Sequence, residues 1–340
     1  MESSEAEAAR RGHPAAESRT SVRTSFIWLL SLVAACLLAT AQAQDYPNKP
    51  IRMVFPYAPG GEADAYARAV AEELRDRLGQ PVIVDSRPGA NTAIAAEIVA
   101  RSPNDGYTLL YSAWSTITTN LVIYPKLPYR LEDFQPISTF YRAPLGIAVR
   151  KDFPAASLKD LIAYARNKGS VAYGTSGAGS SGNLMLARLS RATGAHFEHV
   201  AYKGDAPVVQ DVLGGHLPMF AGALNTAAQH IAAGTLKVLA HSSGERLPAY
   251  PDMATFRDAG FEDQVFTYWH GLAAPAGTPR AIVDRLNAAV ALAADSKRVR
   301  SVMTPFQAVS TTSPEAFGEL IRRDIATWGP VIREMNLVQR

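Results

Sequence analysis

The sequence has 340 residues, of which 47% are hydrophobic and 19% charged, and its formal net charge is +3. This composition is typical of a folded protein of two domains and excludes a disordered chain. The balance of 34 Lys and Arg against 31 Asp and Glu gives no indication of nucleic-acid binding, and a single cysteine excludes an internal disulfide or a zinc site built from cysteines.

Residues 1–43 have the pattern of a secretory signal peptide. Arginines precede an apolar run over 26–38, and residues 41–43 (AQA) match the small-x-small cleavage pattern. The run is shorter than the roughly 20 residues that a membrane-spanning helix needs. We therefore expect export to a bacterial periplasm and a mature chain that begins near Gln44. The alternative is a lipoprotein anchored at Cys36, because residues 33–36 (VAAC) resemble a lipobox.

From Pro50 onward, short apolar runs alternate with amphipathic helical patterns, which predicts β-α-β units and an α/β fold. The expected strands are 51–57, 81–85, 107–113, 171–175, 197–202, 217–221, 236–241 and 267–273. The expected helices are 63–78, 92–101, one that follows a capping pattern at Ser157, others that start near Ser181, Ala206 and Thr226, then 279–294, and one from Pro314 that ends near Gly329-Pro330.

Three strand-to-helix junctions carry glycine or small polar residues: 58–61, 176–182 and 203–207. The first N–H groups of a helix lack intrahelical acceptors and favour anions, and glycine lets a ligand approach the backbone closely. Because ligands of open α/β sheets bind beyond the carboxyl ends of the strands, all three junctions can face one crevice. The alternative is that each glycine only makes a tight turn.

The second junction also matches a cofactor motif. Gly177, Gly179 and Gly182 fit the G-x-G-x-x-G pattern of dinucleotide sites, and Glu198 follows at about the distance of a ribose-binding residue. We expect no such cofactor, because the chain is expected to be exported and Glu198 lies inside a strand pattern.

Catalytic and metal patterns are weak. Gly-x-Ser-x-Gly is absent, so a secreted hydrolase that uses Ser176 or Ser181 is the less favoured alternative. His196 and His199 are three apart on an expected strand and point to opposite faces, which makes a poor metal pair. We predict no catalytic residue and no metal.

Acidic residues at the junctions allow two interpretations. Asp64 and Asp205 can cap helices, or they can accept a hydrogen bond from a ligand hydroxyl or ammonium. Glu62 would repel an anion beside the first junction, so we expect its side chain to turn to solvent.

Seven motifs run in order from residue 46 almost to the C-terminus: 46–52 (YPNKPIR), 59–64 (PGGEAD), 87–90 (RPGA), 105–110 (DGYTLL), 202–207 (YKGDAP), 213–215 (LGG) and 274–279 (APAGTP). Together with the signal peptide, they resemble the tripartite tricarboxylate transporter substrate-binding proteins, also called the Bug family. The sequence departs from the family where Glu62-Ala63 replaces a common Gly-Thr or Gly-Ser pair, in residues 90–93, and at Asn183, where a His is frequent.

The resemblance implies a type II periplasmic binding fold, in which two lobes, each a mainly parallel sheet flanked by helices, are joined by two crossing strands. The crossings would fall near 145–150 and 268–273. Lobe 1 would comprise residues 44–146 and 270–340, and lobe 2 the inserted residues 147–269. Such a protein closes on a small organic anion without catalysis, and delivers it to membrane permease subunits or to a sensor. We expect a monomer without a cofactor.

The resemblance and the junctions select the same candidate ligand-binding residues. From the first junction these are Tyr57, Ala58, Pro59, Gly60, Gly61 and Asp64. From the opposite lobe they are Thr175, Ser176, Gly177, Ser180, Ser181, Tyr202, Lys203, Gly204 and Asp205. The expected ligand is a di- or tricarboxylate, an aromatic acid or an acidic amino acid.

Overall fold

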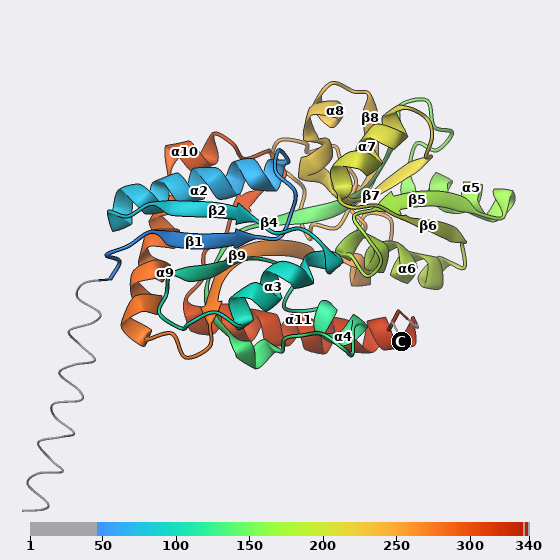
Figure 1. The fold of residues 1–340 in the computed structure, drawn as a ribbon. Helices are drawn as coiled ribbons and strands as arrows, with labels where there is room; N and C mark the ends of the chain where they lie inside the picture. Colours follow the sequence, from blue (N-terminus) through green and yellow to red (C-terminus); the bar gives the residue numbers. More distant parts are fainter. Residues whose placement is uncertain (1–45, 336, 339–340) are drawn as a thin grey trace, which may run out of the picture. The chain divides into compact units, whose positions relative to one another are not determined.

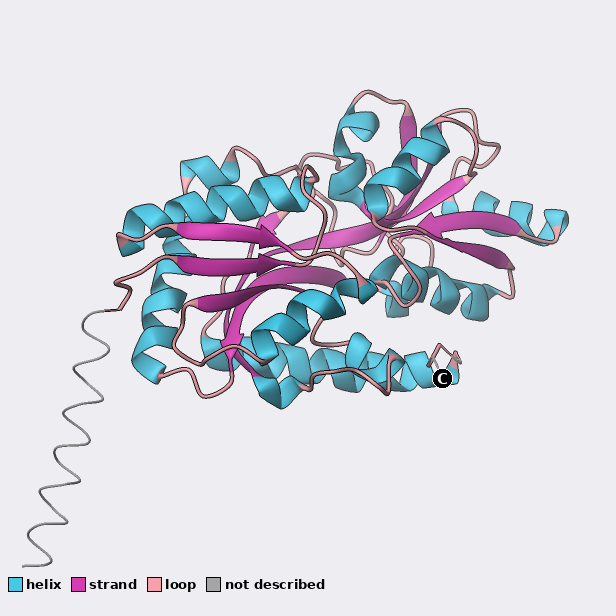
Figure 2. Ribbon diagram, viewed as in Figure 1, coloured by secondary structure: helices cyan, strands magenta, loops and turns pink. Residues whose placement is uncertain are grey.

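The strands of the protein form one mixed, ten-stranded sheet with helices on its faces (Figures 1 and 2). This computed structural model describes residues 46–335 and 337–338, and from Pro47 onward they belong to one compact unit. The predicted signal peptide, its cleavage site and the alternative anchor at Cys36 lie outside the described residues. Among the helices that are described, none combines the length and the apolar character that crossing a membrane requires.

One part of the sheet, here called the first sheet region, is built around a parallel trio in the order β2-β1-β3. These strands are β1 (Ile51–Phe55), β2 (Val82–Ser86) and β3 (Thr108–Ala113). The antiparallel strands β9 (Thr267–Pro275) and the first part of β4 (Phe134–Arg150) extend it, and the short β10 (Ala308–Val309) pairs with β4. Its helices are α2 (Glu62–Leu78), α3 (Ala93–Ala100), α4 (Asn120–Ile123), α9 (Arg280–Ala294), α10 (Lys297–Arg300) and α11 (Pro314–Glu334).

The second sheet region repeats this plan. Its parallel trio has the order β7-β5-β6, and the second part of β4 pairs antiparallel with β7 and with β8. The strands are β5 (Val171–Thr175), β6 (Phe197–Ala201), β7 (Met219–Ala223) and β8 (Leu236–His241), and the helices are α5 (Leu158–Lys168), α6 (Ser181–Thr193), α7 (Asp205–Leu213) and α8 (Ala228–Ala232). In Figure 1, α6 and α7 lie on opposite faces of this region, as α2 and α3 do in the first. The predicted α/β class is confirmed.

The long strand β4 belongs to both sheet regions. Pro144 is the last β4 residue that pairs with β9, opposite Thr267, and the next residue, Leu145, already pairs with Ala223 of β7. The chain returns at Phe266, whose N–H donates to the carbonyl of Ser242 at 2.7 Å immediately before β9 begins. The assignment of the lobes to residues 44–146 with 270–340 and to 147–269 remains a prediction.

Local sequence signals explain most helix ends, but not the last one. Helix α11 begins as predicted, with the Ser313 hydroxyl accepting from the N–H of Ala316 at 3.2 Å. The predicted end near Gly329-Pro330 is wrong, because the helix continues to Glu334. Proline removes one backbone donor, but Trp328 and Ile332 are both buried, so packing of this face holds the helix together beyond the proline.

The core of the first sheet region is rich in aromatic side chains. Phe55, Tyr66, Tyr111, Phe140 and Tyr141 are completely buried, and their rings contact one another mostly edge to face or tilted. These residues come from β1, α2, β3 and β4. They form a rigid base beneath the carboxyl end of β1, where the first junction starts.

Candidate ligand site

The first junction, between β1 and α2, exposes its backbone. Gly60 has a φ of +92°, which favours glycine, and a Cβ placed at Gly60 or at Gly61 would meet no atom within 4 Å. Gly61 is the N-cap of α2 and offers no side chain to the first N–H groups of that helix. The start of α2 therefore presents main-chain donors to open space.

Asp64 holds this junction in shape. Its Oδ2 accepts hydrogen bonds from the N–H of Gly60 and from Nε of Arg68, both at 3.0 Å. The residue is buried, whereas Arg68 is exposed. Within the described residues, Oδ1 of Asp64 has no hydrogen-bond partner. The carboxylate thus acts as a local clamp on the loop, with one acceptor oxygen unused.

The third junction is organised by Asp205, the first residue of α7. Its Oδ2 accepts a hydrogen bond from the N–H of Ala223, at the end of β7, at 3.2 Å. Burial raises the pKa of Asp205 to about 6, and the nearby Ala223 and Ser176 donors oppose that rise. Asp205 therefore brings together the loops that follow β5, β6 and β7. Its Oδ1 is buried and has no hydrogen-bond partner in the part of the chain that the structure describes.

In the second junction, between β5 and α6, the polar groups form hydrogen bonds mainly with one another. The Thr175 hydroxyl donates to the carbonyl of Gly177 at 2.9 Å and lies 2.7 Å from Nε2 of His199. The Ser180 hydroxyl accepts from the N–H of Asn183, the side chain of which accepts from the N–H of Gly179. Most donors that could meet a ligand here already have partners.

The glycines of the second junction have packing roles. A Cβ at Gly179 would overlap with the side chain of Ile123, and one at Gly182 with the carbonyl oxygen of Ala221. Close approach of α6 to β7 thus accounts for Gly182 without any phosphate. The G-x-G-x-x-G match has a structural explanation in the packing of these residues.

Two residues of the third junction that were predicted to bind the ligand, Tyr202 and Lys203, have side chains that face elsewhere. The Tyr202 hydroxyl donates to Oδ2 of Asp211 at 2.5 Å, which directs it toward α7. The Lys203 side chain is exposed to solvent. Gly204, by contrast, has a φ of +132°, and a Cβ there would meet no atom within 4 Å. The backbone of this loop is therefore open in the same way as that of the first junction.

Glu62 differs from its expected state. The predicted solvated side chain is wrong: its carboxylate accepts hydrogen bonds from Nδ2 of Asn225 at 2.5 Å and from Nε2 of Gln307. The other end of the Asn225 side chain accepts from the Tyr268 hydroxyl at 2.6 Å. Burial raises the pKa of Glu62 to about 7 despite these donors. Glu62 thus links α2 to Asn225, which follows β7.

Tyr57 lies where the first and third junctions meet. Its ring stacks on His270 of β9, with centroids 6.0 Å apart. Burial raises the pKa of the Tyr57 hydroxyl, and the negative charges of Asp205 and Glu62 raise it further, so both carboxylates are near this side chain. Tyr57 is therefore the residue around which the candidate site is assembled.

The uncharged imidazole of His270 supports the ring of Tyr57. Its Nδ1 lies 2.9 Å from the hydroxyls of both Tyr111 and Tyr141. Burial lowers the pKa of His270 to about 3, so the imidazole carries no charge near neutral pH. It adds a polar ring to the site but no positive charge.

Sequence reasoning missed the loop at 90–92. Ala90, Asn91 and Thr92 have φ values of +46°, +47° and +76°, a conformation that is unfavourable for residues with a Cβ. Asn91 is held there by Asn120, with which it exchanges two hydrogen bonds, at 2.8 and 2.6 Å. A Cβ at Gly177 would lie 4.0 Å from Oδ1 of Asn91, so this strained loop borders the second junction.

The second junction also contacts α4. The hydroxyl of Tyr124, directly after α4, donates to the carbonyl of Ala178 at 3.3 Å. This bond and the Asn91 contact join the first sheet region to the loop that follows β5. The candidate site is therefore bordered by both sheet regions.

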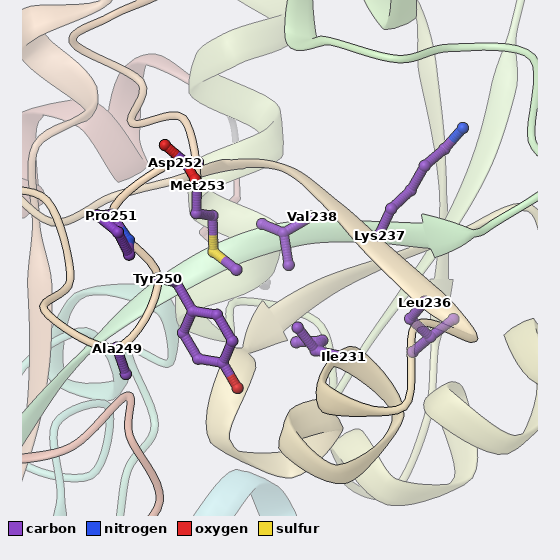
Figure 3. Close-up of a pocket in the computed structure, with 9 residues that line it drawn as sticks. All are labelled: Ile231, Leu236, Lys237, Val238, Ala249, Tyr250, Pro251, Asp252 and Met253. Carbon is purple, nitrogen blue, oxygen red and sulfur yellow. The ribbon is translucent and has the colours of Figure 1, made fainter.

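A separate pocket lies away from all of these residues. Figure 3 shows it beside β8, with a volume of ≈ 420 Å³. It is lined by Ile231, Leu236, Lys237, Val238, Ala249, Tyr250, Pro251, Asp252 and Met253. Its lining includes no predicted site residue, so we place the candidate site at the junctions.

Solved structures with this architecture define the class. A periplasmic binding protein named BugD superimposes with a TM-score of 0.79 at 28% identity, over 87% of this chain and all of that one. MatC from Rhodopseudomonas palustris, solved with malate, gives 0.78 at 29% identity over 84% of this chain and 100% of its own. Another R. palustris protein, solved with adipate, gives 0.80 at 31% identity over 86% of this chain and 99% of its own. The fold is that of a solute-binding protein.

Sequence comparison specifies the family. Residues 66–337 match the tripartite tricarboxylate transporter family receptor, and the chain belongs to that family. BugT of Bordetella pertussis is 34% identical over 310 residues, which cover 89% of this chain and 94% of BugT. A UPF0065 protein of Bordetella bronchiseptica is 36% identical over 261 residues, 75% of this chain and 77% of that protein. The resemblance inferred from the motifs is confirmed.

Proposed function

We propose that this receptor binds a small carboxylate between two lobes and delivers it to the membrane subunits of a tripartite tricarboxylate type transporter. The observation that carries the proposal is the start of α2, where no side chain caps the first N–H groups of the helix and the backbone at Gly60 and Gly61 faces open space near Tyr57. Relatives of the same fold that were solved with malate and with adipate support a carboxylate ligand.

In this proposal the ligand carboxylate meets the N–H groups at the start of α2. Each contact between a charge and a helix dipole contributes roughly 0.3–1 kcal/mol when exposed and up to about 2 kcal/mol when partly buried, so several donors must converge. The open backbone at Gly204, the first residue before α7, supplies donors from the other side. The protein binds and releases its ligand without changing it.

The arrangement of the serines does not favour a hydrolase. Ser176 lies next to Asp205, and His199 contacts Thr175 instead of a serine. A nucleophile, a base and an orienting acid in mutual contact are what serine hydrolysis requires. The family matched by the chain is one of receptors.

We also propose that residues 1–43 direct export and are removed, so that the mature receptor acts in the periplasm. The relative BugD is a periplasmic binding protein, which supports this location. N-terminal sequencing of the protein recovered from periplasm, with a start near Gln44 as the expected result, tests this step.

Calorimetric titration of the mature protein with malate, succinate, adipate, citrate and benzoate tests binding. The matched variant is Gly61→Val, because a Cβ at Gly61 meets no atom within 4 Å and the φ of −83° at this position suits any residue. We expect Gly61→Val to unfold at the wild-type temperature but to bind at least tenfold more weakly. Ala288→Val, on the exposed face of α9, is the control and should bind normally. Equal affinity of Gly61→Val and wild type would contradict the proposed position of the carboxylate.

A further inference from the structure

Two carboxylates flank the candidate site from different elements. Glu62 is the first residue of α2 and Asp205 the first residue of α7, and each follows a glycine N-cap. Asp205 accepts a hydrogen bond from the N–H of Ala223, and Glu62 accepts one from the side chain of Asn225, two residues further along, so both carboxylates lie beside the segment that follows β7. This places two acidic groups where the proposed function puts an anionic ligand.

Neither acid is neutralised by the protein. Over the described ranges, neither Glu62 nor Asp205 takes part in an ion pair, and the guanidinium of Arg68 is bonded to Asp64 instead. The titratable groups that interact with them are phenols, which are uncharged near neutral pH: they are Tyr57, Tyr66, Tyr111, Tyr141 and Tyr268. A buried carboxylate without a cation is costly to keep charged.

Acceptor capacity is left unused at both positions. Oδ1 of Asp205 is buried and receives no hydrogen bond from any described residue. Each oxygen of Glu62 accepts one amide hydrogen bond, which leaves further lone pairs free. Buried acceptors of this kind are normally satisfied, so these oxygens can accept a donor from outside the chain.

We propose that Glu62 and Asp205 form a subsite for a positively charged group, so that the ligand carries an ammonium group as well as a carboxylate. The ammonium donates to these two carboxylates, while the carboxylate of the same ligand meets the main-chain donors at the start of α2. This inference rests on the proposed function and narrows it to aminocarboxylates. A dicarboxylate without nitrogen would place a further negative charge beside the two acids.

Titration with matched ligand pairs tests the subsite. The pairs are succinate with aspartate and butanoate with 4-aminobutanoate, which differ mainly in the ammonium group. For the wild-type protein we expect the amine-bearing member of at least one pair to bind tenfold or more tightly than its partner. In Glu62→Gln and in Asp205→Asn this preference should shrink about tenfold or reverse. The control Asp284→Asn removes a charge from the exposed side of α9 and should keep the wild-type preference.

A second readout does not depend on the variants folding normally. At pH 6.5, binding of the amine-bearing ligand to the wild-type protein should release protons, because the cation favours ionised carboxylates. Comparison of binding enthalpies in buffers of different ionisation enthalpy measures this release. Proton uptake or no exchange would overturn the subsite.

The possible outcomes separate the two proposals. Binding of both succinate and butanoate as tight as that of their amine-bearing partners, with the same ratios in both variants, would overturn the cation subsite but leave carboxylate binding intact. Absence of binding by every ligand of both panels would contradict the proposed function, and the subsite with it. If the wild-type protein prefers the amine-bearing ligand and this preference disappears in Glu62→Gln and Asp205→Asn, the result supports both proposals.

Discussion

The first and second junctions have the same plan, a strand followed by a glycine-bearing loop and a helix, yet they differ in what surrounds them. At the first junction the glycines face open space and no side chain caps α2. At the second, Ser180 caps α6, and Gly179 and Gly182 are pressed against other parts of the protein. Glycine in such a loop therefore indicates either access for a ligand or tight packing, and only the neighbouring atoms decide which.

The largest effect that can test this comparison is on folding. We expect Gly182→Ala to lower the free energy of unfolding by about 3 kcal/mol, because the new Cβ overlaps with the backbone of Ala221, which cannot move aside as a side chain can. Gly61→Ala should change it by less than about 0.5 kcal/mol. Urea unfolding of both variants measures the difference, and equal stabilities would contradict the contrast.

The next prediction concerns how the free energy of unfolding depends on pH through two acids, Glu62 of the first junction and Asp205 of the third. The folded-state pKa of Glu62 is raised from 4.5 to about 7, so its contribution to stability is fully present below pH 4.5 and is lost as pH rises through 7. The loss amounts to roughly 3 kcal/mol. For Asp205, raised from 3.8 to about 6, the same loss falls at lower pH.

Urea unfolding between pH 4 and 8 separates these two contributions. Glu62→Gln should remove the part of the decline in stability that spans pH 4.5 to 7, and Asp205→Asn the part that spans pH 3.8 to 6. Asp284→Asn should leave the profile unchanged. A decline that is the same in all of these proteins would show that neither acid is responsible.

The smallest effect concerns the strained loop that borders the second junction. Ala90 is exposed and has a φ of +46°, so Ala90→Gly should relieve strain and raise the free energy of unfolding by roughly 0.5–1 kcal/mol. The same substitution at Ala288, inside helix α9, should lower it by a similar amount. Destabilisation by Ala90→Gly would mean that this loop is not strained in solution.

Much of the fold could be predicted because it depends on local patterns. The alternation of apolar residues located β5 and β8 over their observed bounds, and the capping pattern at Ser157 located the start of α5. The end of α11 could not be found in this way, since it depends on the burial of Trp328 and Ile332 by distant parts of the chain.

The sequence predicted the position of the candidate site but not the ionisation state of its acidic residues. Each of the three junctions does lie between a strand and a helix, as the sequence indicated. The state of Glu62, however, depends on Asn225 and Gln307, which are 163 and 245 residues away. The strain at residues 90–92 also depends on a distant partner, Asn120. No local pattern contains that information.

The sharing of β4 has a consequence for the order in which the chain can fold. The second sheet region takes its strands from β4 to β8 and has all of them once residue 241 has emerged. The first sheet region places β9 between β3 and β4, so its sheet has a gap until residues 267–275 follow. A polypeptide that emerges N-terminus first therefore completes its middle before its beginning, and β3 must wait with one edge unpaired until β9 has emerged.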